Sequence, residues 1–199
     1  MRVFFDVDTQ VDFMLKEGSL YVPDAENIIT NLKKLTEYAR ERGVRIFGSV
    51  DRHFKYDPEL KRNGGPFPDH CMNGTRGQEK IDATKPLRPI FIENRKYSKN
   101  ELDEILKKHS EIFIEKQSYD VFSNPNTDYL LGGVEEAFVY GVATEFCVDA
   151  VVRGMVKKKI KVFVVEDAIK AIDEEKGRKK IEEWKRLGVR LVKTDNVSV

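Results

Sequence analysis

Short runs of β-branched and aromatic residues alternate with longer amphipathic stretches along the whole chain. The run Arg2–Phe5 is followed by an amphipathic stretch over Ala25–Glu41 and then by a second apolar run over Val44–Val50. Apolar residues of the amphipathic stretch recur at steps of three and four, and Gly43 stands where a helix commonly ends. This order is typical of parallel strands joined by a helix. We therefore expect an α/β fold with three α/β/α layers around a mostly parallel central sheet.

The same alternation continues to the end of the chain. Further strands are predicted at Pro89–Ile92, Glu111–Glu115, Glu136–Tyr140, Ile160–Val165 and Val189–Val192. Further helices are predicted at Lys99–His109, Glu145–Lys158 and Glu174–Leu187. From Asp51 to Lys80 the periodicity is lost and Gly and Pro accumulate, and so long a loop in a compact domain is usually functional. The sequence contains no repeat or linker, so we expect a single domain over residues 1–199.

Composition excludes several classes of partner. The net charge of +1 comes from 35 basic and 34 acidic residues spread along the chain, so we expect no nucleic-acid partner. No apolar segment approaches the roughly 18 residues of a membrane span, which predicts a cytoplasmic protein without a membrane partner. Two cysteines, Cys71 and Cys147, are too few for a disulfide framework and indicate a reducing compartment with a free thiol.

Reactive residues follow four of the predicted strands. In open α/β sheets ligands bind beyond the carboxyl ends of the strands, so these positions are the ones to inspect. They hold Asp6 and Asp8, then Asp51 and His53, then Lys116, and finally the segment 141–147 that ends in Cys147. A single Asp after a strand is more often a turn former than a catalytic group. Convergence of four such positions on one edge of a sheet favours a catalytic site.

Cys147 is the candidate nucleophile. It is expected in the first turn of a helix, where the helix dipole and unpaired amides favour a thiolate and can also hold an oxyanion. A cysteine is by itself more often a small buried apolar residue. Asp8 as a base and Lys116 as a nearby cation favour the catalytic interpretation.

Asp51, His53 and His70 form a candidate metal site. Residues two apart in an extended segment point the same way, so Asp51 and His53 share one face. His70 lies in the glycine-rich loop and can complete the set. Two imidazoles and a carboxylate suit zinc, manganese or iron rather than calcium or magnesium. A surface pair with an unrelated loop histidine is an equally weighted alternative from these residues alone.

Five segments together resemble nicotinamidases of the isochorismatase-like cysteine hydrolase family. They occur in the order found in that family and span most of the chain. The segments are Asp8-Thr9-Gln10-Val11-Asp12-Phe13 with Glu17-Gly18-Ser19-Leu20, Asp51-Arg52-His53, the loop 67–77 that contains Pro68-Asp69-His70-Cys71, Lys116 with Ser118-Tyr119-Asp120-Val121-Phe122, and Gly141-Val142-Ala143-Thr144-Glu145-Phe146-Cys147-Val148.

The resemblance implies an isochorismatase-like hydrolase fold and a cysteine-dependent amidase. It implies a catalytic triad of Asp8, Lys116 and Cys147, a cis peptide bond between Val142 and Ala143, and an oxyanion hole made by the amides of Ala143 and Cys147. The implied reaction converts nicotinamide to nicotinate and ammonia through a cysteine thioester, a step of NAD salvage. We also expect a homo-oligomer.

The resemblance further implies one divalent metal, zinc in the first place and manganese or iron otherwise, on Asp51, His53 and His70. Some relatives have another histidine near this metal, where the present chain has Asp57-Pro58-Glu59, so Glu59 is an additional candidate ligand. The implied substrate contacts are Phe13, Phe67, Tyr119 and Phe122. Phe67 stands where many relatives carry a tryptophan, and the segment between Gly77 and Lys116 is longer than the family pattern.

Other functions remain open at this point. The run Phe4-Phe5-Asp6-Val7-Asp8-Thr9 also resembles the first motif of haloacid-dehalogenase-type phosphatases, with Asp6 as nucleophile, Asp8 as acid and Glu166-Asp167 as metal ligands. Such an enzyme gives no role to Cys147 or to the two loop histidines. A relative that acts on another amide or on isochorismate is a further alternative. A non-catalytic binding protein would require loss of the triad.

The choice of lysine also has an alternative. Lys96 follows an apolar run and precedes a Tyr-Ser pair, as a catalytic lysine of this kind would. We favour Lys116 because its strand is the one immediately before Glu136–Tyr140 in the sequence. Adjacent parallel strands would then place the ammonium beside the Cys147 thiol.

Overall fold

A computed structural model of the chain describes residues 1–198 and contains a seven-stranded sheet. All strand pairs are parallel, and the strand order is β3-β4-β2-β1-β5-β6-β7. The strands are β1 (Arg2–Val7), β2 (Ile46–Asp51), β3 (Ile90–Ile92), β4 (Glu111–Lys116), β5 (Glu136–Val142), β6 (Lys161–Lys170) and β7 (Arg190–Val192). The predicted parallel α/β architecture is confirmed.

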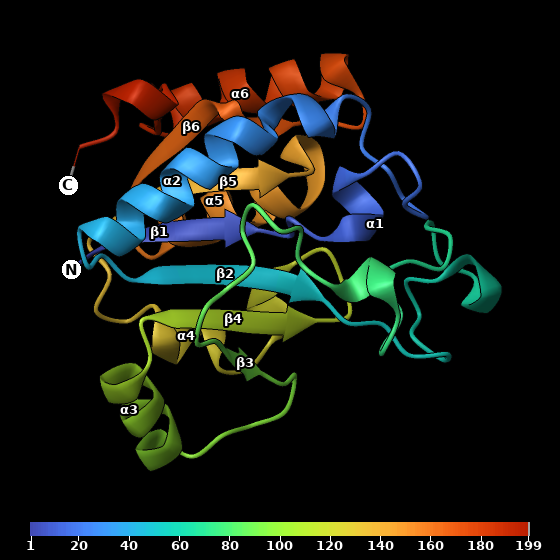
Figure 1. Cartoon of the computed structure of the whole chain (residues 1–199), viewed down its shortest axis with the longest axis horizontal. Coiled ribbons are helices and arrows are strands. Elements are labelled where there is room, and N and C mark those ends of the chain that lie inside the picture. Colours follow the sequence, from blue (N-terminus) through green and yellow to red (C-terminus); the bar gives the residue numbers. More distant parts are fainter. Residues whose placement is uncertain (199) are drawn as a thin grey trace.

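Helices cover both faces of this sheet (Figure 1). They are α1 (Val11–Met14), α2 (Ile29–Glu41), α3 (Lys99–Lys108), α4 (Thr127–Leu130), α5 (Asp149–Lys157) and α6 (Glu174–Arg186). Apolar residues of α1 and α2 pack on one face, and those of α3 to α6 pack on the other. Strand β1 shows why both faces are covered, because Phe5 joins one hydrophobic core and Phe4 joins the other.

Most predicted elements lie within a few residues of the observed ones. Helices α1 and α4 were not predicted, because four residues are too few to display a helical period. The predicted helix Glu145–Lys158 begins instead with a π-helical turn over Thr144–Val148, and α5 follows it. Strand β6 continues to Lys170, past the end predicted at Val165.

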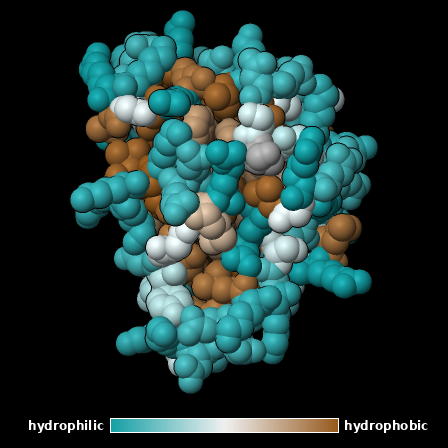
Figure 2. Space-filling model, turned by 90° about the vertical axis from the view of Figure 1, so that its left-hand side faces the viewer, coloured by the Kyte–Doolittle hydropathy of each residue, from teal (hydrophilic) through white to brown (hydrophobic). Residues whose placement is uncertain are grey.

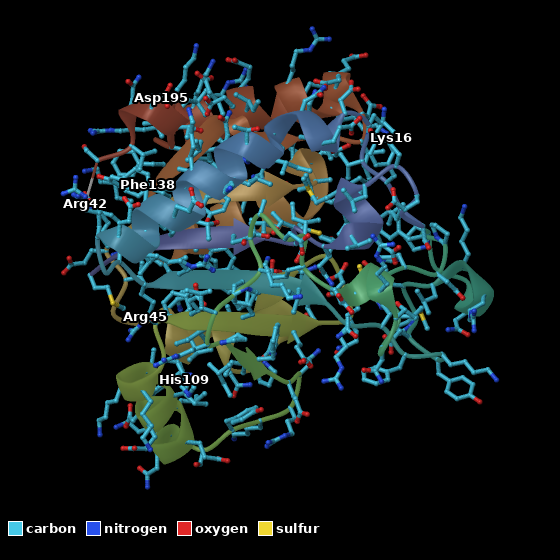
Figure 3. The ribbon with its side chains drawn as sticks, viewed as in Figure 1. Lys16, Arg42, Arg45, His109, Phe138 and Asp195 are labelled. Atoms are coloured by element: carbon cyan, nitrogen blue, oxygen red, sulfur yellow. The ribbon has the colours of Figure 1, made fainter. Side chains whose placement is uncertain are left out.

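The two ends of the parallel strands differ in their surroundings. The long loop between β2 and β3 extends from the carboxyl ends of the strands, on the right in Figure 1. His109, at the end of α3, is labelled at the opposite end of the sheet in Figure 3, whereas Lys16 lies on the side of α1. Figure 2 shows the face of the molecule at the amino-terminal ends of the strands. On this face hydrophilic side chains border several hydrophobic patches. Within residues 1–198, no helix combines the length and the apolar character that crossing a bilayer requires.

Candidate active site

Asp8 lies directly beyond β1 in a tightly held turn. Its side chain is fully buried, and its backbone has the left-handed φ of 48°. The Asp8 amide donates to the carbonyl of Ser49 at 3.2 Å, and the carbonyl of Asp8 accepts from the amide of Gln10 at 2.7 Å. A non-glycine residue rarely adopts this conformation unless its surroundings impose it, as they do at many functional sites.

Gln10 connects this turn to the end of β2. Its side-chain amide donates to the carbonyl of Asp51 at 2.7 Å, while its side-chain oxygen accepts from the Asp51 amide, also at 2.7 Å. The same amide group donates to the carbonyl of Gln78 at 2.8 Å. Sequence reasoning did not assign this role to Gln10, although the residue lies inside the quoted Asp8–Phe13 segment. The clamp fixes Asp8 and Asp51 relative to each other.

Lys116 ends β4 and extends a fully buried side chain toward Asp8 and Cys147. Its Nζ lies 3.0 Å from Oδ2 of Asp8 and 3.6 Å from Sγ of Cys147, and it donates a short hydrogen bond to Oδ1 of Asp51. The three residues of the predicted triad are therefore brought together.

The expected adjacency of the strands that carry Lys116 and Cys147 is nevertheless wrong. Strands β4 and β5 are not adjacent, because β2 and β1 lie between them. Three strand spacings of about 4.8 Å each separate β4 from β5. The long lysine side chain crosses part of this width, and the turn after β5 returns Cys147 toward it. Lys96, the alternative, lies in an exposed segment after β3.

Cys147 lies in the π-helical turn that follows β5. The turn is closed by hydrogen bonds from the amides of Phe146 and Val148 to the carbonyl of Ala143, at 3.1 and 3.2 Å. The peptide bond between Val142 and Ala143 is cis, as predicted. Cys147 is 7% exposed and borders a pocket, so it is both shielded from bulk water and accessible to a small ligand.

Burial and neighbouring charges together shift the pKa values of the three triad residues. It raises the pKa of the Asp8 carboxyl and raises the pKa of the Cys147 thiol well above its usual value, in both cases against the opposing charge of Lys116. For Lys116, burial lowers the pKa, but the carboxylates of Asp51 and Asp8 outweigh it and hold that pKa well above its usual range. In the protein without substrate, burial therefore favours the neutral thiol of Cys147. The thiol needs a base, and Asp8 is placed to act as one.

Asp51, His53, Glu59 and His70 form a cluster whose ligand atoms all lie within 4.8 Å of one another. Oδ2 of Asp51 lies 3.5 Å from Nε2 of His70 and 3.9 Å from Nε2 of His53. Oε2 of Glu59 lies 3.4 Å from Nε2 of His53. The predicted metal residues are brought together, and Glu59 joins them.

The donor atoms of this cluster fit a transition metal. Nδ1 of His53 is held by Asp57 at 3.1 Å, and Nδ1 of His70 is held by the carbonyl of Pro68 at 2.7 Å. Such contacts orient the other ring nitrogen of a metal-binding histidine toward the ion. Nε2 of His53 is buried and makes no hydrogen bond to any described residue. Two imidazoles and two carboxylates form a ligand set suited to a metal such as zinc.

An aromatic pocket lies between the triad and this cluster. Of the four predicted substrate contacts, Phe13, Phe67 and Tyr119 line it. Phe122 does not, because its ring packs against Gly154 of α5 and fills the space where a side chain would lie there. The complete lining is Phe13, Leu20, Val22, Asp51, Glu59, Phe67, His70, Tyr119, Ala143, Phe146, Cys147 and Ile172. Leu20, Val22, Phe146 and Ile172 were not predicted as substrate contacts. Leu20 and Phe146 lie inside the segments that carry the family resemblance, whereas Val22 and Ile172 carry no signal beyond being apolar.

Residues 3–196 match the isochorismatase domain. The chain belongs to this family. It is similar to the nicotinamidase of Escherichia coli (strain K12), with 24% identity over an alignment of 204 positions. The alignment covers 86% of this chain and 84% of that protein. It is also similar to the nicotinamidase of Saccharomyces cerevisiae (strain ATCC 204508 / S288c), with 25% identity over an alignment of 212 positions. That alignment covers 88% of this chain and 90% of that protein.

A solved structure has the same fold as this isochorismatase-family chain. The crystal structure of the pyrazinamidase of Pyrococcus horikoshii in complex with zinc superposes with a TM-score of 0.79 and 26% identity. The match covers 96% of this chain and 98% of that one. The similarity therefore extends over nearly the whole length of both chains.

Membership of the isochorismatase family excludes the phosphatase alternative, and the geometry agrees. Asp6 is paired with the buried ammonium of Lys80 at 3.0 Å and accepts a hydrogen bond from Thr9 at 2.8 Å, so it is not a free nucleophile. Asp167 lies inside β6 rather than after it, and its carboxylate accepts from the amide and hydroxyl of Thr194 at 2.8 and 2.9 Å. Asp6 and Asp167 thus serve the packing of the fold, whereas Asp8 belongs to the triad.

Proposed function

We propose that the chain is a nicotinamidase, which hydrolyses nicotinamide to nicotinate and ammonia. The observation that carries this proposal is the position of the Lys116 ammonium, 3.0 Å from Asp8 and 3.6 Å from Sγ of Cys147, beside an aromatic pocket bordered by the metal-ligand cluster. Similarity to two nicotinamidases over most of their length supports the same reaction. The product would enter NAD salvage.

The residues of the triad would carry out an acyl transfer. Asp8 takes the proton of the Cys147 thiol as the sulfur attacks the amide carbonyl, and the backbone amides of Ala143 and Cys147 hold the oxyanion. The Lys116 ammonium stabilises the negative charge as it passes from the Asp8 carboxylate to the sulfur of Cys147. Asp8 then returns the proton to the departing ammonia, and water hydrolyses the thioester to the acid. The side chains of Phe13 and Phe67 provide apolar walls for a flat heteroaromatic ring.

Asp51, His53, His70 and Glu59 would hold the metal, for which we propose zinc. When bound, the ion would supply a Lewis acid that binds the ring nitrogen of the substrate and orients its carboxamide. Zinc accords with the mixed imidazole and carboxylate ligand set and with the zinc complex of the Pyrococcus horikoshii pyrazinamidase. Manganese and iron are the alternatives that metal analysis would distinguish.

The test is release of ammonia from nicotinamide by the purified protein. We expect turnover that a chelator abolishes and that added zinc restores. Another amide hydrolysed far faster than nicotinamide would replace the substrate assignment with that of a different isochorismatase-like amidase. Full activity in the presence of a chelator and in metal-free buffer would contradict the orienting role of the metal.

Metal content gives a separate prediction. We expect one divalent ion per chain in the wild type and none after His53→Ala is combined with His70→Ala, because two of the four ligands are lost. Elemental analysis of gently purified protein measures this. His109→Ala is the matched control, since His109 lies at the other end of the sheet and its removal should leave the metal content unchanged (Figure 3). A metal-free wild type would contradict the prediction.

A further inference from the structure

The two carboxylate oxygens of Glu59 face two different parts of the site. Oε2 points to the metal-ligand cluster, 3.4 Å from Nε2 of His53. Oε1 accepts a hydrogen bond from the backbone amide of Tyr119 at 2.9 Å. Glu59 is only 9% exposed, so water competes little for either oxygen. A single rigid carboxylate therefore joins the metal cluster to a segment 60 residues further along the chain.

Both segments joined to Glu59 form walls of the aromatic pocket. Tyr119 lines the pocket, its ring lies 6.4 Å from that of Phe146, and the residue is 49% exposed. Its backbone is therefore anchored at Glu59 although its side chain is not packed into the core. The main chain of Glu59 also accepts from the amide of Phe67 at 3.2 Å, and Phe67 lines the same pocket.

We propose that Glu59 couples metal occupancy to the pocket wall. An ion held by Asp51, His53 and His70 fixes Oε2 of Glu59, and Oε1 of the same carboxylate then fixes the Tyr119 backbone. Metal and ring-shaped ligand consequently bind with positive cooperativity, even when the ligand does not touch the metal. The identity of the ligand rests on the proposed function, whereas the response of the Tyr119 segment to metal does not. Thermodynamic linkage makes the coupling reciprocal.

Asp57 provides a matched control for Glu59. Its carboxylate also contacts the cluster, 3.1 Å from Nδ1 of His53, but it accepts its other hydrogen bond from the amide of Phe54, which does not line the aromatic pocket. Replacement of Asp57 therefore disturbs a metal ligand without cutting the connection to Tyr119. Comparison of Glu59 and Asp57 variants separates metal affinity from coupling.

The first experiment follows hydrogen exchange of a peptide that covers residues 117–121, with metal-stripped protein and with zinc alone. In the wild type we expect saturating zinc to slow exchange of the Tyr119 amide at least about fivefold, the lower end of typical coupling between sites. Asp57→Asn should keep this response once zinc is saturating. Glu59→Gln, whose amide can still accept from Tyr119 but is a poor metal ligand, should lose it. An unresponsive wild type, or a Glu59→Gln variant that responds like wild type, would overturn the proposal.

The second experiment measures binding of benzamide, which has no ring nitrogen and cannot bind the metal through one. In the inactive Cys147→Ala background we expect zinc to lower the Kd of benzamide at least about fivefold. Adding Glu59→Gln should abolish this difference. Zinc-independent binding of benzamide would contradict the coupling. Absence of ammonia release from nicotinamide would contradict only the proposed function, because the exchange experiment uses no substrate.

Discussion

Residues 1–198 include two buried lysines, Lys116 and Lys80, and only Lys116 belongs to the candidate active site. Lys116 and Lys80 are 0% and 7% exposed, and each ammonium lies 3.0 Å from an aspartate that extends from β1 or its end. Lys80 pairs with Asp6, donates to Thr9 at 2.8 Å and lies 4.7 Å from the ring centroid of Phe113. Lys116 pairs instead with Asp8 and with Asp51, and approaches a thiol.

The difference lies in what surrounds each ion pair. Around Lys80 the polar partners hydrogen-bond to one another, since Thr9 donates to Asp6 and shares a hydrogen bond with Thr84. None of these groups lines the aromatic pocket. Around Lys116, Asp51 and Cys147 both line it. Burial of a charged pair is thus common to both regions. A nucleophile beside the pair and an opening for a ligand distinguish the catalytic one.

The Lys80 region also explains part of the long segment after Gly77. Gln10 and Lys80 form an isolated antiparallel bridge. The amide of Val11 donates to the carbonyl of Glu79 at 2.8 Å, and the amide of Ile81 donates to the carbonyl of Thr9 at 3.1 Å. The start of the segment therefore braces the turn that carries Asp8. Its buried ion pair stabilises the catalytic geometry without taking part in the chemistry.

Removal of the nucleophile should have the largest effect. We expect Cys147→Ala to abolish turnover while the protein stays folded, because no other group can form the thioester. Cys71→Ala should keep most of the activity, since Cys71 does not line the aromatic pocket and its sulfur donates to the carbonyl of Gly77 at 3.7 Å. Steady-state kinetics and iodoacetamide labelling test both variants. Inactivation that follows labelling of Cys71 alone would reverse the assignment.

Removal of the catalytic ammonium should rank second. Lys116→Ala is expected to lower kcat/KM by roughly 10⁴-fold, as loss of a triad member does in comparable hydrolases. Lys96→Ala should be nearly silent because Lys96 lies in an exposed segment. Kinetics on the two variants decides between them. A crippled Lys96 variant beside a healthy Lys116 variant would contradict the assignment of this whole region.

Removal of the other buried ammonium should affect stability more than catalysis. Lys80→Met leaves the Asp6 carboxylate buried without its cation, which should lower the free energy of unfolding by about 3–5 kcal/mol. The double variant Asp6→Asn with Lys80→Met should recover part of this loss. Denaturant unfolding measures it, and kcat of the folded fraction should fall far less than in Lys116→Ala. A kinetic loss as large as that of Lys116→Ala would erase the distinction between the two lysines.

The smallest effect should be a displaced acid limb in the pH profile. Because burial raises the pKa of Asp8, the carboxyl is protonated, and unable to act as a base, up to a higher pH than an ordinary aspartate with a pKa of about 3.9. We therefore expect kcat/KM to rise with pH along a limb centred above that value. Lys80→Met should leave the limb in place, because no ion pair with Asp8 is removed. A limb at the ordinary carboxyl pKa would contradict Asp8 as the base.

Much of this protein follows from local sequence pattern. Apolar periodicity placed the four longer helices and, apart from the longer β6, the strands to within a few residues, because the side of a helix or strand that is buried must be apolar at that period. Asp8, Asp51, Lys116 and Cys147 could be selected because residues beyond parallel strands meet at one edge. The family resemblance singled out the same residues, and the match to the isochorismatase domain confirms that family.

Tertiary structure alone decided how these residues meet. The order of the strands separates β4 from β5, yet Lys116 still contacts Cys147 because a buried lysine side chain is long enough to cross the ends of the strands between them. Phe122 turned toward α5 rather than the pocket, and Glu59 divided its two oxygens between His53 and Tyr119. A sequence states which groups are available. Which of them are brought within hydrogen-bond distance depends on strand order and on the packing of residues far apart in the chain, and local patterns do not contain that information.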